Sequence, residues 1–433
     1  MVLKNASAFI DGKFQSSDIE VTDGKISAVR INNQESGSCS EPVSDDSIGG
    51  QIVDCTGKMV WPGLFDIHTH GCLGFDFSKS SPGELLRMCS FYARHGVTSV
   101  LATTMTNEDS QCARAMGYIR QAMERQAETQ RSAQGMLQTD AAQRPSQGML
   151  QDVTPQQPAQ GAAPDISRIP GAKIRGIHAE GPFFGPAKRG AHDEQYLRPV
   201  SQQLVDEYQR LSGYAIRLFD IDPSLPGALD FIRNNREHFT ISIAHTDCDY
   251  NTAKSAAEAG ASHVTHLFNA MRPLLHREPG VVGAAFECGL NAELICDGIH
   301  IHPAVIRLMF AAMPERILLI SDSINPTGLA DGHYTAGGLP VEVKDGRAYL
   351  ADGTLAGSTI TLFDAVKNAV RFGIPLERAL SAATSAPAHA VGLANEAGSI
   401  ACGRAADLLI VGEGLALEQV MLDGRFLPMQ ETL

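Results

Sequence analysis

Short apolar runs alternate with helical stretches through the middle of this chain. Eight runs have the length and composition of buried strands: 63–70, 97–103, 173–180, 215–221, 239–245, 262–267, 292–297 and 316–322. Most of the segments between them carry helix signals; for example, Ser81-Pro82 opens a helix that runs to Arg94 and stops at Gly96. Eight strand–helix units over residues 62–397 predict an α/β fold, a (β/α)8 TIM-like barrel, with a doubly wound open sheet as the alternative.

The two ends of the chain show a different pattern, of short strands broken by turns. Asp11-Gly12 and Asp23-Gly24 are hairpin signals, and a similar alternation returns after residue 406. Neither end has enough strands for an independent sheet. We therefore expect residues 1–61 and 398–433 to combine into one small β-sandwich domain, with the polar, Gly/Ser-rich stretch 33–50 as a loop.

One segment interrupts the strand–helix alternation. Residues 127–166 are rich in Gln, Ala and Pro, and Gln134–Gln138 returns as a near-repeat at Gln147–Gln151. The period is too short for a repeat architecture. The composition predicts a flexible surface insertion between the second and third strands, which a local duplication explains; an interaction arm is the alternative.

Composition narrows the range of partners. The 433 residues carry a formal net charge of −14, which argues against nucleic acid because a phosphate backbone would be repelled. No apolar run approaches the length of a membrane span, and no signal peptide is visible. The nine cysteines are scattered without a Cys-x-x-Cys pair, which is typical of reduced thiols in a cytoplasm. No Gly-x-Gly-x-x-Gly opens a helix, so dinucleotide binding has no support.

Candidate chemistry gathers where the predicted strands end. Ionisable side chains stand at the carboxyl ends of the first, third, fifth, sixth and eighth strands: His68 and His70, Glu180, His245, His266 and Asp322. In a barrel these ends surround one mouth, where such enzymes place their active sites. Six such groups meeting there by chance is improbable.

These residue types suit a divalent metal. Imidazole and carboxylate ligands without a thiolate favour zinc, iron or a similar ion in an open, catalytic site. An aspartate at the eighth strand could take a proton from water and deliver it to a leaving nitrogen. The pattern therefore predicts metal-assisted hydrolysis of an amide-like bond. His178 is expected to pack or hydrogen-bond within the barrel wall. His263 faces away from His266 in a regular strand and is not expected to bind the metal.

Several motifs carry a resemblance to a known family. Pro62–Gly71 resembles Pro-Gly-x-x-Asp-x-His-x-His-Gly, and the most specific match runs from Gly176 through Glu180 to His192. Thr265–Met271, Arg277–Gly280, Asp297–His300, Leu355–Ser358 and Gly403–Leu408 follow in the expected order. In these motifs the chain resembles the N-acetylglucosamine-6-phosphate deacetylases of the amidohydrolase superfamily. Phe219–Ser224 departs from the family's Ala-Pro-Glu, so the pocket wall at that point is not predicted.

The resemblance implies roles for individual residues. Glu180, His245 and His266 would hold the principal metal and Asp322 would be the general base and acid, with His68 and His70 as a second, weaker metal position. The substrate would contact Ala191, His192, Asn269, Ala270, Arg277, His300, Leu355, Ala356 and Gly357. Family members are usually homodimers in which the phosphate-binding arginine, here Arg277, can come from the neighbouring subunit. One or two divalent ions per subunit are expected.

The implied reaction is hydrolysis of N-acetylglucosamine 6-phosphate to glucosamine 6-phosphate and acetate, a step of amino-sugar catabolism in the cytoplasm. The N-acetylgalactosamine analogue is the nearest alternative. A cyclic-amide hydrolase of the dihydroorotase or hydantoinase type is disfavoured, because no lysine ends the third or fourth strand. A non-catalytic scaffold is also disfavoured, since it would be expected to lose ligands or the acid/base, and all are present.

Overall fold

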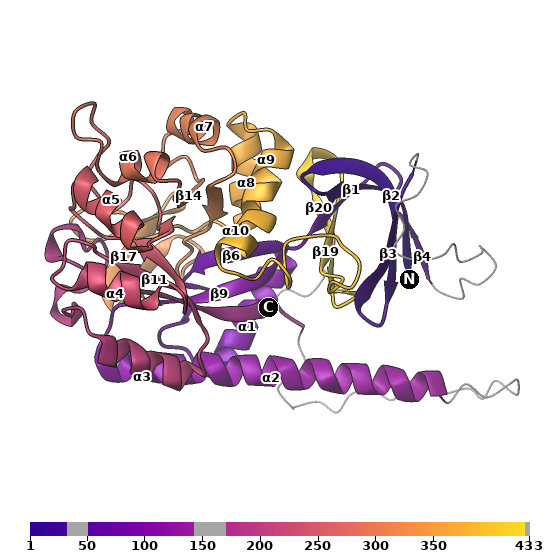
Figure 1. The fold of residues 1–433 in the computed structure, drawn as a ribbon. Helices are drawn as coiled ribbons and strands as arrows, with labels where there is room; N and C mark the ends of the chain where they lie inside the picture. Colours follow the sequence, from indigo (N-terminus) through magenta and orange to yellow (C-terminus); the bar gives the residue numbers. More distant parts are fainter. Residues whose placement is uncertain (33–50, 143–169, 429–433) are drawn as a thin grey trace, which may run out of the picture.

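The computed structural model describes residues 1–32, 51–142 and 170–428, with the side chains of residues 133–142 left out. It comprises a barrel surrounded by helices and a separate sheet beside it (Figure 1). The predicted loop at 33–50 lies outside the described residues.

Eight parallel strands form the barrel: β6 (Leu64–Thr69), β9 (Val97–Met105), β10 (Lys173–Phe183), β11 (Ile216–Ile221), β12 (Thr240–Ile243), β13 (His263–Val264), β14 (Asn291–Ile295) and β15 (Ile317–Ile320). Each strand pairs with the next in chain order, as the sequence predicts. The first and last strands meet just beyond β15, where the backbone N–H of Asp322 donates to His68 O at 2.9 Å and that of His70 donates to Ser323 O at 2.8 Å. The barrel prediction is confirmed.

Helices pack around the barrel because each buries one apolar face against the strands. They are α1 (Pro82–Arg94), α2 (Asp109–Ala142), α3 (Gln202–Ser212), α4 (Ala228–Asn235), α5 (Tyr250–Ala259), α6 (Gly280–Glu287), α7 (Pro303–Ala312), α8 (Leu362–Arg371), α9 (Leu376–Ala383) and α10 (Ser385–Ala390). The predicted boundaries of α1 are confirmed. Ser81 and Glu84 form a capping box around Pro82, and Gly96, at φ +80°, follows the last turn.

The prediction of a flexible segment from residue 127 is wrong for its first part, because α2 continues to Ala142. Ala, Gln, Glu and Arg are good helix formers, and no proline interrupts the chain before Pro145. Tertiary contacts anchor this helix: Gln126 Nε2 donates to Ala172 O at 2.8 Å, and Gln130 Nε2 donates to Asp423 Oδ2 at 3.1 Å. The remainder of the predicted insertion, 143–166, lies outside the described residues.

Both chain ends contribute to the second sheet, which has eight strands: β1 (Val2–Ile10), β2 (Lys13–Thr22), β3 (Lys25–Ile31), β4 (Ile52–Asp54), β5 (Met59–Pro62), β19 (Leu408–Val411), β20 (Leu417–Leu422) and β21 (Arg425–Phe426). Strand β5 joins the two ends, since it pairs with β1 on one side and with β19 on the other. The sheet curls over an aliphatic core that includes Leu3, Ile19, Ile26, Val60 and Leu408.

Smaller elements lie in the loops of the barrel. The antiparallel strands β16 (Gly332–Ala336), β17 (Leu339–Lys344) and β18 (Arg347–Tyr349) form a three-stranded sheet after β15, and β7 (Gly71–Cys72) pairs with β8 (Phe75–Asp76) after β6. Sequence analysis did not predict the three-stranded sheet.

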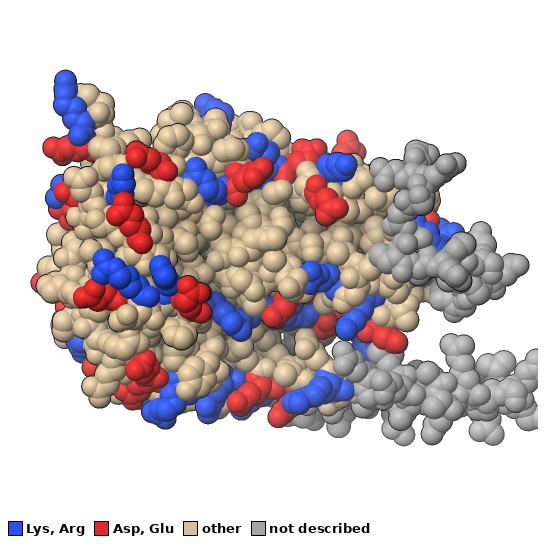
Figure 2. All heavy atoms as spheres, in the orientation of Figure 1, with Lys and Arg blue, Asp and Glu red and all other residues tan. Residues whose placement is uncertain are grey.

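The surface carries both signs of charge. On the face drawn in Figure 2, basic side chains are interspersed with acidic ones over a mainly uncharged surface. Among the helices of the described residues, none has the length and apolar character that crossing a membrane requires.

Candidate active site

The carboxyl ends of the barrel strands surround a cavity of about 290 Å³. Most of the predicted site residues line it: His70, Glu180, Ala191, His192, His245, His266, Asn269, Ala270, His300, Asp322, Leu355, Ala356 and Gly357. Ala336 of β16 also lines the cavity, so the three-stranded sheet forms part of its wall. Two predicted residues do not line it: His68 is fully buried beneath the cavity, and Arg277 is exposed elsewhere.

Glu180, His245 and His266 converge from three strand ends. Glu180 Oε1 lies 3.1 Å from His245 Nε2 and 3.2 Å from His266 Nε2, and the two nitrogens are 3.1 Å apart. All three side chains are buried. Three donor atoms so close together from three different strands have the composition and arrangement of a metal site.

The position of the proton on the His245 ring is compatible with a cation bound by this group. His245 Nδ1 lies 3.0 Å from Lys188 O, a carbonyl that can only accept, so Nδ1 carries the proton and Nε2 has a lone pair. Burial lowers the pKa of His245 to about 4, so the ring is neutral near pH 7. A neutral imidazole nitrogen facing a carboxylate and a second imidazole is the donor set of a divalent ion.

His68, His70 and Asp322 form a second group against the first. His70 Nε2 lies 3.2 Å from Asp322 Oδ1 and 3.3 Å from Glu180 Oε2, while His68 Nε2 lies 3.4 Å from Asp322 Oδ1. Burial favours the protonated form of Asp322, but the charge of His68 and the hydrogen bond of His70 hold its pKa below the usual range. Asp322 is therefore a carboxylate near pH 7, able to accept a proton.

His192 faces Glu180 as a donor. Its Nδ1 accepts a hydrogen bond from the backbone N–H of Thr106 at 3.3 Å, so the proton resides on Nε2, 3.3 Å from Glu180 Oε2. A nitrogen that carries a proton cannot bind a metal. His192 therefore lies beside the metal group without belonging to it.

The other predicted substrate contacts lie on the rim. His300 Nδ1 donates to Asp297 Oδ2 at 2.6 Å, which fixes the ring at the cavity wall. Asn269 Nδ2 donates to the backbone oxygens of His266 and Leu267, at 3.2 and 3.4 Å, and so braces the turn after β13. Ala270 lies in the same turn.

Backbone strain marks the strand ends that carry the site. His245, His266 and Asp322 have φ angles of +44°, +30° and +48°, in the left-handed region that residues other than glycine rarely adopt. Such conformations persist where the surrounding structure over-determines them. Here the chain turns sharply after the strand and directs the side chain into the mouth.

Arg277 lies in the exposed loop between Met271 and α6, beside the ring of His276. Within this chain it is not brought to the cavity. His178, expected to pack or hydrogen-bond in the barrel wall, is fully buried below the mouth and bonds to Asp220. His263, expected not to be a ligand, is also fully buried and bonds to Glu293.

Sequence reasoning missed Glu293. It is fully buried on β14, and its carboxylate contacts His68, His263 and the backbone of His266. The sequence did contain a signal for this residue. A single carboxylate stands inside a run that is predicted to be a buried strand, and a buried charge without a partner is unfavourable.

Comparisons with known proteins agree with this geometry. The model of the amidohydrolase family matches residues 173–427 of this chain. N-acetylglucosamine-6-phosphate deacetylase of Bacillus subtilis is 34% identical over 397 residues, which cover 91% of this chain and 88% of the relative. N-acetylgalactosamine-6-phosphate deacetylase of Escherichia coli O157:H7 is 29% identical, with 96% of each chain covered.

A solved structure shares the whole architecture. The N-acetyl-D-glucosamine-6-phosphate deacetylase of Mycobacterium smegmatis, determined as a mutant in complex with N-acetyl-D-glucosamine-6-phosphate, superposes with a TM-score of 0.79. It is 27% identical and covers 98% of both chains. By its barrel, its convergent histidines and carboxylates and these relatives, this chain belongs to the amidohydrolase family.

Proposed function

We propose that this chain hydrolyses the acetamide of N-acetylglucosamine 6-phosphate to glucosamine 6-phosphate and acetate. The observation that carries the proposal is the convergence of Glu180, His245 and His266 next to Asp322 in the cavity. Relatives over nearly the full length of the chain are named for this deacetylation. The reaction makes the chain a metal-dependent hydrolase of a linear amide.

Glu180, His245 and His266 would hold the principal metal, and zinc or iron suits their donor set. When bound, such an ion supplies a Lewis acid that polarises a carbonyl and acidifies water. The protein contributes the alignment: Lys188 O fixes the tautomer of His245, and His192 Nε2 donates to Glu180. His68, His70 and Asp322 would provide a second, weaker position, supported by the proximity of their ligand atoms.

Asp322 is the proton carrier. Its Oδ1 accepts a proton from the attacking water and then donates it to the amide nitrogen as the C–N bond breaks, so that the amine leaves neutral. His70 Nε2, 3.2 Å from that oxygen, orients the carboxylate. Because the side chain is only 10% exposed, the proton is not readily lost to bulk solvent.

The sugar phosphate would lie against the other wall of the cavity. His192 and His300 would contact the sugar, Ala191 and Leu355–Gly357 would line its pocket, and the backbone around Asn269 and Ala270 would receive the phosphate. Since Arg277 does not line the cavity of its own chain, we propose that it serves the site of a second copy in a cytoplasmic homodimer. A guanidinium can hold a phosphate through two parallel hydrogen bonds.

A direct assay tests the proposal. Purified protein is incubated with N-acetylglucosamine 6-phosphate, and acetate and glucosamine 6-phosphate are measured together with the metal content. Equal amounts of both products from protein that contains metal are expected, and more than one ion per chain would support the second position. Absence of both products from metal-loaded protein would disprove the proposal.

The N-acetylgalactosamine analogue is the second candidate, because the Escherichia coli relative bears that name and aligns over 96% of this chain. The two sugars differ in the configuration of one hydroxyl. Measuring kcat/KM for both with one enzyme preparation separates the candidates, and the gluco substrate is expected to have the higher value.

A further inference from the structure

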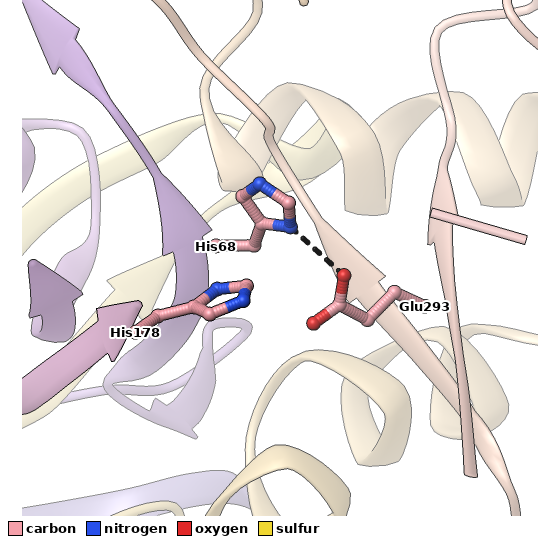
Figure 3. Close-up of side chains that lie close together, drawn as sticks. All are labelled: His68, His178 and Glu293. Atoms are coloured by element: carbon pink, nitrogen blue, oxygen red, sulfur yellow. Dashed lines mark hydrogen bonds and ion pairs between the residues drawn. The ribbon is translucent and has the colours of Figure 1, made fainter. Parts of the chain in front are cut away.

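Glu293 is an ionisable residue for which the proposed reaction has no direct use. It lies on β14, inside the barrel and below the cavity, with no exposed surface. Figure 3 shows its carboxylate aimed at the ring of His68, with the ring of His178 beside them. A buried carboxylate is costly unless its neighbours satisfy it, so its partners indicate its role.

Glu293 joins two parts of the site that are far apart in the sequence. Its Oε2 accepts from His68 Nδ1 at 2.9 Å and from the backbone N–H of His266 at 3.1 Å. Its Oε1 accepts from His263 Nε2 at 3.1 Å. One carboxylate therefore contacts a histidine side chain from β6 and the backbone of a histidine that follows β13.

The contact with His68 determines which ring nitrogen faces the site. Since the carboxylate accepts, Nδ1 carries a proton, and the bond fixes the rotation of the ring. Nε2 then faces the site, 3.2 Å from His70 Nε2 and 3.6 Å from Glu180 Oε1. Histidine ligands in metal sites are commonly oriented by such a bond from the other ring nitrogen.

The contact with His266 acts on the backbone. His266 has a φ angle of +30°, which is unfavourable for a residue with a side chain. Its N–H has Glu293 as a charged acceptor, and a hydrogen bond to a charged group is stronger than one between neutral groups. The bond holds the strained turn that aims His266 Nε2 at Glu180.

His68, His178 and Glu293 also bring three donor atoms together, which raises the alternative of a separate metal site. His178 excludes it. Its Nδ1 lies 3.2 Å from Ile67 O and its Nε2 lies 2.9 Å from Asp220 Oδ1, so both ring nitrogens are engaged by oxygen atoms of the barrel and neither is directed at an ion shared with His68 and Glu293. Glu293 thus acts through hydrogen bonds.

We infer that Glu293 is a positioning residue of the metal site, which orients the ring of His68 and holds the backbone of His266 from below. This inference rests on the metal site of the proposed function. It predicts that Glu293 contributes to metal affinity without touching substrate or metal.

Glu293→Gln removes the charge with little change of shape, and Asp220→Asn is the matched control. Asp220 is an equally buried carboxylate in the same barrel interior, bonded to His178 and Thr265. For each protein we would measure the dissociation constant of Zn²⁺ by competition with a chromophoric chelator, and the melting temperature of the metal-free form.

Glu293→Gln is expected to weaken Zn²⁺ binding about 10–100-fold, as loss of such outer partners typically does, while Asp220→Asn stays close to the unsubstituted protein. Unchanged affinity in Glu293→Gln would overturn the inference, and so would an equal loss in both variants, which would indicate a general loosening of the interior. If Glu293→Gln does not fold, Glu293→Asp, which keeps the charge but withdraws it by one methylene, must weaken binding.

The same measurement separates this inference from the proposed function. If the unsubstituted protein binds no Zn²⁺, the metal site itself is disproved. If it binds Zn²⁺ and Glu293→Gln binds equally well, only the role of Glu293 is disproved.

Discussion

The core of the terminal sheet and the inside of the barrel are equally buried but differ in chemistry. The sheet encloses aliphatic side chains such as Leu3, Ile19 and Val60. The barrel encloses, below its mouth, fully buried ionisable groups: Asp66, His68, His178, Asp220, His263 and Glu293. Apolar burial stabilises in proportion to area, whereas buried charges require specific partners.

The difference shows where the fold supports function. Removing a methyl group from the sheet core leaves a cavity and costs stability alone. Substituting one residue of a buried hydrogen-bonded network leaves its partner without a hydrogen bond. The side chains that extend from the network into the site can then reorient. We expect variants of the sheet core to affect unfolding, and variants of the barrel-interior groups bonded to site residues, such as Glu293, to affect metal binding and turnover.

The largest effect on turnover is expected for Asp322, at the mouth of the barrel above the buried ionisable groups. Asp322→Asn should reduce kcat about 10²–10⁴-fold, because an amide cannot carry the proton. The principal metal should stay bound, since Glu180, His245 and His266 remain. Steady-state kinetics with metal analysis checks this, and a variant that retains turnover would remove Asp322 from the mechanism.

In the aliphatic core, Ile19→Ala should lower the free energy of unfolding by about 2–5 kcal/mol. Ile19 is fully buried between strands of the terminal sheet and touches no site residue. Chemical denaturation measures the loss, and Ile19→Val, expected to cost about 0.5–1.5 kcal/mol, gives the graded control. A fall in kcat/KM of the folded variant would contradict the separation of the two interiors.

The smallest effect is expected for Arg277, which lies outside both the sheet core and the barrel interior. Arg277→Ala should raise KM for the sugar phosphate about tenfold with little change in kcat, because it removes a charge-assisted contact to a group remote from the reacting bond. Arg233→Ala, an exposed arginine paired with Asp230, is the control. An unchanged KM for Arg277→Ala would mean that Arg277 does not serve the site of a second copy.

Local patterns were sufficient for most of the fold. All eight barrel strands were predicted within a few residues, because a buried parallel strand is a short apolar run bounded by helix and turn signals. The terminal hairpins followed from Asp-Gly turns. The extension of α2 to Ala142 was missed, because composition suggested disorder where helix propensity and contacts from Gln126 and Gln130 prevail.

For the site, the sequence by itself determined which ionisable groups stand at the strand ends, because that depends only on where each apolar run stops. Only the tertiary structure decided how they are used: His68 lies beneath the cavity, Arg277 lies away from it, and Glu293 joins the network. The tertiary structure also decided which ring nitrogen of each histidine donates a hydrogen bond. The proton of His245 is set by Lys188 O and that of His68 by Glu293, and such partners come from other parts of the barrel, which no local pattern encodes.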